Sequence, residues 1–390
     1  MRTRLVWTSV GAVGLLGAIG GAWMLSLPNT ATDSAPPPID EREKEAFLAA
    51  VKPRRRRRPL IAVVGINDAT ETVDYLMAYG LLRRADVADV TLLATGDGPV
   101  KLYPVFTVEP HATIAQFDAQ HPDGADYVIV PAMSRDDDPA ALAWIAAQAA
   151  KGAVVIGVCA GAKVVAQAGL LDGRHGTTHW YYVDQLRKRH PRVQYVPDRR
   201  FVIDDRVLTT TGITASIPMA LTLIEAIAGR DTAGRVAESV GVARWDARHD
   251  SHAFQFTRPF ALTAIGNTLA GWRRERFGIE LEPGVDEVAL ALVADAWSRT
   301  YRSRALTWSR TKGVKETRNG VRIVPDRVAA AWPRDRRLPP IAERKPIRAL
   351  NDALSAIAAR YGVRTSDFVA MQLEYPARWA EQREVARKAG

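Results

Sequence analysis

The sequence has one cysteine in 390 residues, which excludes an internal disulfide and any zinc site built on several cysteines. It also lacks a P-loop and the glycine fingerprint of dinucleotide-binding domains. We therefore expect no cofactor and no metal site. Hydrophobic residues make up 47% of the chain, which excludes general disorder. The net charge of +10 permits contact with anionic lipid or nucleic acid but does not require either.

Charge is absent from one long segment near the N-terminus. Leu5–Leu27 is almost entirely apolar and follows Arg2 and Arg4. About 20 such residues can span a bilayer as a helix, and no small-x-small cleavage site of a signal peptide stands out. We therefore predict an uncleaved single-pass anchor in the inner (cell) membrane. Arg2 and Arg4 favour a cytoplasmic N-terminus and a periplasmic body, although the Arg54–Arg58 run favours the opposite orientation.

Composition divides the chain into four parts. The predicted anchor covers residues 1–27, and a Pro/Arg-rich linker covers residues 28–58. An α/β domain is predicted at residues 59–230, followed by a mainly helical C-terminal extension at residues 231–390. Its expected helices include Pro259–Phe277 and Val285–Arg302, and a hairpin is expected near Asn319-Gly320.

Apolar strands alternate with helical segments from residue 60 to residue 229. This alternation predicts a doubly wound layer with a mostly parallel sheet. The expected strands are Leu60–Gly65, Val90–Leu93, Tyr127–Val130, Ala153–Val158, Phe201–Ile203 and Val207–Thr210, and the expected helices are Thr70–Arg84, Pro139–Lys151, Ala160–Ala168, Trp180–Arg189 and Thr214–Ala228.

The only cysteine follows directly on one of these strands. Gly157–Gly161 reads Gly-Val-Cys-Ala-Gly, and an Ala-rich helical segment begins at once. Gly–x–nucleophile–x–Gly at a strand-to-helix turn is the layout of a nucleophile elbow. The start of a helix favours a thiolate over a thiol, so Cys159 is a candidate nucleophile; a buried, inert cysteine is the alternative.

Three motifs together resemble the ThiJ/PfpI (DJ-one) superfamily of class I glutamine-amidotransferase-like domains. They are the elbow with the following Ala168–Trp180 segment, Glu71-Thr72-Val73, and Thr211–Ser216. The Thr-His-Trp form most resembles isonitrile hydratases and the ligand domains of AraC-type regulators. The resemblance implies a flavodoxin-like fold and a homodimer, whose interface the extension could build or block.

The resemblance also implies the site residues. Cys159 matches the reactive cysteine, Glu71 the carboxylate beside it, and His179 a supporting histidine. A thiolate beside a carboxyl group separates the two pKa values, so Glu71 would hold a proton and donate a hydrogen bond to sulfur. A solvated Glu71 and a purely structural His179 are the alternatives.

Backbone N–H groups of Ala160 and Gly161 could stabilise a developing oxyanion. Ala132 and Met133 stand where relatives usually have two glycines, in a loop that also lines the pocket. Ala160 stands where the hydratases have threonine and PfpI-like proteases have histidine, which disfavours both specific activities.

These observations lead to three hypotheses. The first is a cysteine-dependent enzyme of hydrolase or hydratase type that acts on a small electrophilic carbon. The second is a non-catalytic ligand or redox sensor that signals through the extension. The third is a DNA-binding regulator, for which the helix-turn-helix-like segment Ser355–Glu374 is the only signal, so nucleic acid is not expected as a partner.

Overall fold

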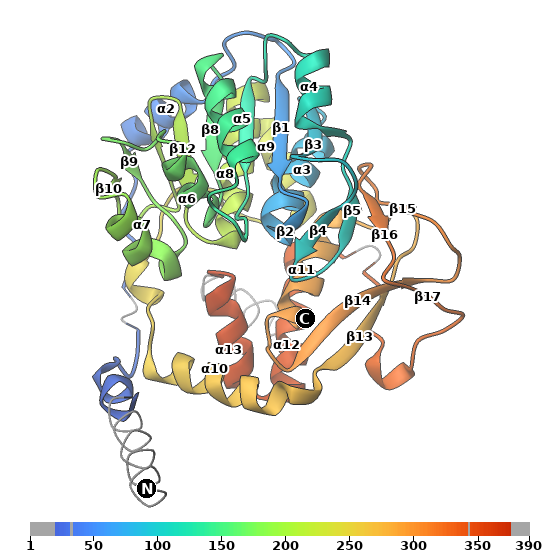
Figure 1. Ribbon diagram of the computed structural model, residues 1–390. Coiled ribbons are helices and arrows are strands. Elements are labelled where there is room, and N and C mark those ends of the chain that lie inside the picture. The colour runs from blue at the N-terminus through green and yellow to red at the C-terminus, as the bar shows by residue number, and fades with distance from the viewer. Residues whose placement is uncertain (1–19, 32–33, 342–343, 376–390) are drawn as a thin grey trace, which may run out of the picture.

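The computed structural model describes residues 20–31, 34–341 and 344–375, and its centre is a seven-stranded sheet (Figure 1). The strands lie in the order β11–β12–β8–β7–β1–β3–β6, and all neighbours are parallel except β11 and β12. Their bounds are β1 Leu60–Gly65, β3 Asp89–Ala94, β6 Ala112–Thr113, β7 Tyr127–Val130, β8 Val154–Gly157, β11 Phe201–Asp204 and β12 Val207–Thr210.

Helices cover both faces of this sheet because its central strands are apolar on both sides. In β1, Ile61 and Val63 belong to one buried cluster, whereas Ala62 and Val64 belong to the other. This confirms the doubly wound α/β domain. Three helices pack on the first face, α3 Thr72–Ala85, α8 Ser216–Ala228 and α9 Arg230–Val240, and three on the second, α4 Ile114–Gln120, α5 Pro139–Ala150 and α6 Gly161–Gln167.

The C-terminal part is helical, as expected, and also contains a small sheet that the sequence analysis missed. The helix expected over Pro259–Phe277 ends at Ala270, and a strand begins at Glu275. Phe277, Gly278 and Ile279 are consecutive buried residues, so this strand shows no alternation of buried and exposed positions. The elements are α10 Arg258–Ala270, α11 Glu287–Ser298, α12 Pro346–Tyr361 and α13 Val363–Gln372, with parallel strands β13 Glu275–Glu280, β14 Ser303–Ser309 and β17 Arg327–Val328.

The expected hairpin near Asn319-Gly320 is confirmed and connects the C-terminal part to the α/β domain. Its second strand pairs with a strand of the domain, through Ile323 and Val108. Figure 1 shows this mixed sheet beside the central one. Its strands are β15 Lys315–Glu316, β16 Arg322–Val324, β5 Thr107–Glu109, β4 Val100–Tyr103 and β2 Asp68–Glu71; the remaining elements include α2 Glu41–Ala50, α7 Val183–Arg189, β9 His175–Gly176 and β10 Gln194–Tyr195.

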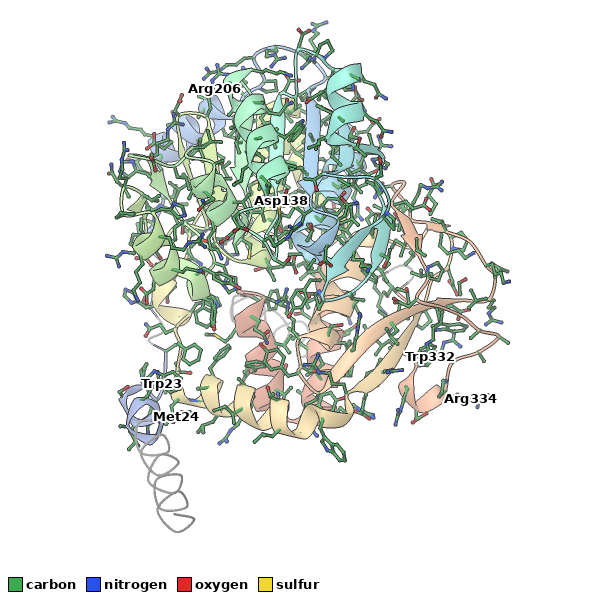
Figure 2. The ribbon with its side chains drawn as sticks, viewed as in Figure 1. Trp23, Met24, Asp138, Arg206, Trp332 and Arg334 are labelled. Carbon is green, nitrogen blue, oxygen red and sulfur yellow. The ribbon has the colours of Figure 1, made fainter. Side chains whose placement is uncertain are left out.

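The N-terminal prediction needs a correction. Among residues 20–31, 34–341 and 344–375, no helix combines the length and the apolar character needed to cross a bilayer. The transmembrane helix expected at residues 5–27 and the membrane location based on it therefore lose their support; residues 1–19 lie outside the described residues. Where the description begins, Trp23 and Met24 lie near α10 (Figure 2), and Arg258 donates hydrogen bonds to the carbonyls of Met24 and Leu25.

The arginine run of the predicted linker lies against the α/β domain. Arg55 donates to the carbonyl of Asp123 at 2.7 Å, and Arg56 forms an ion pair with Asp126 at 2.9 Å. Arg58 binds the carboxylate of Asp89 at 2.7 Å. These three side chains therefore have protein partners, while the boundaries of the four parts stay predictions.

The elbow requires a glycine at position 161, which gives a test of the fold. A Cβ on Gly161 would collide with the carbonyl oxygen of Val130 in the neighbouring strand, so we expect Gly161→Ala to lower the free energy of unfolding by about 3 kcal/mol. Gly266→Ala is the matched control, because Gly266 is exposed on α10 with open space around it. Urea unfolding should show this control unchanged or stabilised by up to about 1 kcal/mol; equal losses in both variants would contradict the close packing at the elbow.

Candidate functional site

Cys159 lies where β8 ends, in a backbone conformation that few residues other than glycine adopt. Its φ is +57°, a strained value for a residue with a side chain. Two hydrogen bonds hold it there: its N–H donates to Thr210 Oγ1 at 3.1 Å, and its carbonyl accepts from Thr178 Oγ1 at 3.0 Å. The residue is 4% exposed. The sharp turn expected of a nucleophile elbow is therefore present.

The Cys159 thiol lies near two buried carboxyl groups, that of Glu71 and that of Asp74, in the first turn of α3. Asp74 Oδ2 accepts a hydrogen bond from the N–H of Ala132 at 3.1 Å. Its second oxygen, Oδ1, has no hydrogen-bond partner in the part of the chain that the structure describes. The thiol and Asp74 therefore form a buried pair in which a proton can be shared.

Glu71 lies one turn earlier and has other partners. It is the N-cap of α3, and its Oε2 accepts from the N–H of Asp74 at 2.6 Å. Its Oε1 forms an ion pair with Arg299 at 2.6 Å, and the same guanidinium binds Asp295 Oδ2 at 2.7 Å. Each Glu71 oxygen thus accepts a hydrogen bond, and burial, with the neighbouring carboxyl group of Asp74, raises the pKa of Glu71 well above its ordinary value. Its role as a proton donor to the sulfur stays a prediction.

The cluster contains three buried carboxyl groups and a single guanidinium. Burial raises the pKa of Asp74 to about 7, although its hydrogen bond from Ala132 opposes the shift. Burial and the neighbouring carboxyl group of Asp74 also raise the pKa of the Cys159 thiol. The expected low-pKa thiolate is therefore absent in this closed arrangement, because desolvation and negative neighbours outweigh the N–H of Ala160 that faces the sulfur.

Of the two backbone donors expected to stabilise an oxyanion, Gly161 is already engaged, whereas Ala160 faces the sulfur. The N–H of Gly161 donates to the carbonyl of Val158 at 2.7 Å, and that of Ala132 binds Asp74. Met133 is buried in the second core cluster and bridges to Thr70. The oxyanion role expected of these residues therefore stays a prediction.

His179 has two partners, neither of which is the cysteine. Its Nδ1 accepts from the N–H of Tyr181 at 3.1 Å, so Nε2 is the donor in its 3.0 Å contact with the carbonyl of Gln372. Burial lowers the pKa of His179, which favours this neutral ring. Its observed contacts support the 3-10 turn that follows it and attach the end of α13.

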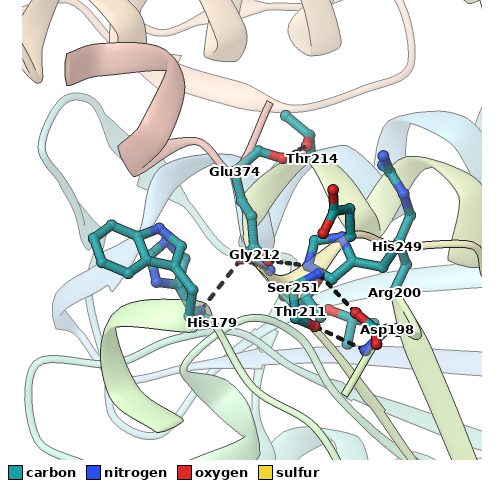
Figure 3. Close-up of polar contacts among 12 residues, drawn as sticks. His179, Asp198, Arg200, Thr211, Gly212, Thr214, His249, Ser251 and Glu374 are labelled. Carbon is teal, nitrogen blue, oxygen red and sulfur yellow. Dashed lines mark hydrogen bonds and ion pairs between the residues drawn. The ribbon is translucent and has the colours of Figure 1, made fainter. Parts of the chain in front are cut away.

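A second polar cluster lies beside His179 and is formed by the last described residues (Figure 3). Glu374 is 3% exposed and accepts from the N–H of Gly212 at 2.5 Å. Its other oxygen pairs with His249 Nε2 at 2.9 Å, and its backbone carbonyl accepts from Thr214 Oγ1 at 2.7 Å. This cluster fastens the C-terminal segment to the loop that follows β12.

Three residues of the site were not predicted from the sequence. Asp74 had a local signal, because it lies three residues after Glu71 and therefore one helical turn away. Arg299 and Glu374 had none, since they lie 228 residues from Glu71 and 162 residues from Gly212.

Parts of this chain match one family model and several proteins of known name. Residues 61–226 match the model of the DJ-1/PfpI family. An isonitrile hydratase of Pseudomonas putida is 43% identical over 98 residues, which are 25% of this chain and 41% of that protein. The HTH-type transcriptional regulator CdhR of Pseudomonas aeruginosa is 33% identical over 125 residues, 32% of this chain and 37% of that protein. The chain thus spans less than half the length of these two relatives.

Among solved structures, Drosophila melanogaster DJ-1beta aligns over 48% of this chain and 100% of its own, with 24% identity and a TM-score of 0.43.

The pKa of Asp74 predicts how stability depends on pH. The unfolded chain releases this proton near pH 3.8, whereas the folded protein holds it until about pH 7. The stabilisation of the folded state by protonated Asp74 is therefore complete below about pH 3.8 and is lost as the pH rises through 7. Because Asn cannot ionise, the stability of Asp74→Asn relative to wild type should rise by about 2 kcal/mol between pH 5 and pH 8.

Urea unfolding at a series of pH values measures this difference. Asp97→Asn, at an exposed loop position, serves as the control and should follow wild type. A constant difference between Asp74→Asn and wild type across this range would mean that Asp74 is ionised throughout.

Proposed function

Since residues 61–226 are a DJ-1/PfpI family domain, we propose that this protein is a cysteine-dependent enzyme of hydratase or hydrolase type that acts on a small electrophilic carbon. The observation that carries the proposal is the pairing of Cys159, in its strained elbow, with the buried carboxyl group of Asp74. Such strain persists only where the surrounding structure enforces it, and it is concentrated at functional sites.

The pair can move the proton that a thiol addition requires. As Cys159 Sγ forms a bond to the electrophilic carbon, the S–H proton passes to ionised Asp74. Asp74 then donates this proton to the carbon of an isonitrile, to the oxygen of an aldehyde, or to the nitrogen of the amine that leaves an amide. Water attacks the same carbon and displaces the sulfur, which recovers its proton. A carboxyl group with a pKa of about 7 suits both directions of transfer near neutral pH.

The similarity to an isonitrile hydratase supports this reaction type and places isonitriles among the compounds to test. Ala160 lacks the hydroxyl group that the sequence analysis expects in such hydratases, so small aldehydes and amides belong in the same panel.

A non-catalytic ligand sensor is the second candidate. It is favoured by the engaged donors of Gly161 and Ala132 and by the closure of the site by the C-terminal part. The similarity to HTH-type transcriptional regulators agrees with it. A DNA-binding role is less well supported, because α13 buries Phe368 and Val369, which leaves this helix a structural part of the C-terminal layer.

Steady-state assays of the purified full chain with isonitriles, aldehydes and amides test the enzyme. We expect Cys159→Ala to lose activity entirely and Asp74→Asn to lose about 100-fold in kcat/KM, the usual contribution of a proton-transfer group. Asp126→Asn is the matched control. Asp126 is buried just before β7 and accepts a hydrogen bond from the N–H of Leu60, at the end of the strands away from Cys159.

Turnover by Cys159→Ala at the wild-type rate would refute the enzyme hypothesis. Compounds that raise the melting temperature of wild type without being converted would favour the sensor instead.

A further inference from the structure

We propose that the loop after β12 forms part of a carboxylate-binding subsite beside Cys159, which Glu374 of the C-terminal part fills in this structure and a carboxylate group of the substrate fills during turnover. This inference rests on the proposed function and narrows its substrate class to small electrophiles that also carry a carboxylate.

Several donors converge on the Glu374 carboxylate (Figure 3). The N–H of Gly212 donates to Glu374 Oε2 at 2.5 Å, and the N–H of Trp180 donates to the same oxygen at 3.4 Å. His249 Nε2 lies 2.9 Å from Oε1, and the positive charge of Arg200 also acts on this carboxylate. His249 is buried together with Glu374, so the carboxylate is bound in a place shielded from water, where such contacts are strong.

The segments that provide the two N–H groups of the subsite also hold Cys159. Thr178 Oγ1 donates to the Cys159 carbonyl at 3.0 Å, and the Cys159 N–H donates to Thr210 Oγ1 at 3.1 Å. Trp180 and Gly212 each lie two residues further along the chain, and two residues span at most about 7 Å. A small molecule can therefore place its carboxylate in the subsite and its electrophilic carbon at the sulfur.

Glu374 fits the subsite imperfectly, which is the property of a group that can be displaced. Its φ is +51°, a strained value for a residue with a side chain. Oε1 lies within ion-pair distance of His249, yet among the described residues no aligned hydrogen bond reaches this oxygen. A buried oxygen without a hydrogen bond is costly. A ligand whose carboxylate aligns with both donors gains this bond and relieves the strain.

Displacement of Glu374 couples the binding of a substrate to the opening of the site. The carbonyl of Leu373 accepts from the N–H of Thr214 at 3.1 Å, and the carbonyl of Glu374 accepts from Thr214 Oγ1 at 2.7 Å. These contacts belong to the same short segment, so it moves when Glu374 leaves. Exchange of one carboxylate for another keeps the charge of the interior constant, so the exchange avoids the cost of burying a further anion.

The test compares two alkylating reagents on the single cysteine of the full chain. Iodoacetate carries a carboxylate, whereas iodoacetamide is neutral and of nearly the same size. Both react with the thiolate, so the ratio of their rates at one pH does not depend on the pKa or the exposure of the sulfur. Glu374→Ala empties the subsite, so the iodoacetate-to-iodoacetamide ratio should rise about tenfold over wild type. The iodoacetate rate should also saturate with concentration, while the iodoacetamide rate stays linear.

Glu374→Gln keeps the volume of the side chain and provides a second measurement if Glu374→Ala does not fold. It removes the competing charge but leaves the subsite filled, so we expect a smaller rise of the ratio, about threefold. A ratio equal to that of wild type in the folded variants would overturn the subsite. An iodoacetate rate that stays linear in Glu374→Ala would do the same, because the lost charge would then act from a distance.

Gln372→Ala is the matched control. Gln372 lies in the same segment and donates from Nε2 to the Arg299 carbonyl at 3.0 Å, so its loss loosens the segment without changing its charge. Both reagents should then react faster by the same factor, and the ratio should stay at the wild-type value. A ratio that rises as far as in Glu374→Ala would mean that loosening alone explains the preference, against the proposal.

The two proposals fail in different ways. Alkylation requires no turnover, so the preference for iodoacetate persists even if the protein is a sensor and not an enzyme. If wild type converts acetaldehyde as well as glyoxylate, the corresponding aldehyde with a carboxylate, and the alkylation ratio does not respond to Glu374, the enzyme stands and only the subsite is refuted.

Discussion

The buried ion pair between Glu71 and Arg299 is the contact on which the rest of the site depends. It joins the first turn of α3 to the end of α11, and Glu71 also caps α3 through the N–H of Asp74. Desolvating such a pair is costly, and removing one partner leaves an uncompensated charge. The α/β domain and the C-terminal part must therefore fold against each other for either charge to be stable in the interior.

Two attachments enclose the cysteine from different sides. Arg299 acts on the carboxyl groups of α3, whereas Gln372 and Glu374 bind His179 and the loop after β12. Both are made by the C-terminal part, and Gln372 links them through its contact with the Arg299 carbonyl. A change in the docking of α13 would therefore alter the exposure of Cys159 and the electrostatics of its neighbours together, which gives the enzyme and the sensor hypotheses a common physical basis.

The sequence predicted much of the fold because buried parallel strands are continuous apolar runs. The bounds of β1, β7 and β12 were predicted residue for residue. The first residues of the strand Glu275–Glu280, up to Phe277, were assigned to a helix, since they adjoin a longer helical pattern. At the site, the position of Cys159 followed from the two glycines around it, whereas Arg299 did not, because no local pattern encodes a partner 228 residues away.

The elbow and the charge cluster have opposite effects on the protonation of the Cys159 sulfur. An elbow holds a nucleophile close to the N–H of Ala160, which favours the thiolate, whereas burial beside Asp74 and Glu71 favours the thiol. The second effect is larger, because burial and the two carboxyl groups outweigh the single N–H of Ala160. Reaction therefore requires either that Asp74 accept the thiol proton or that the site open to water.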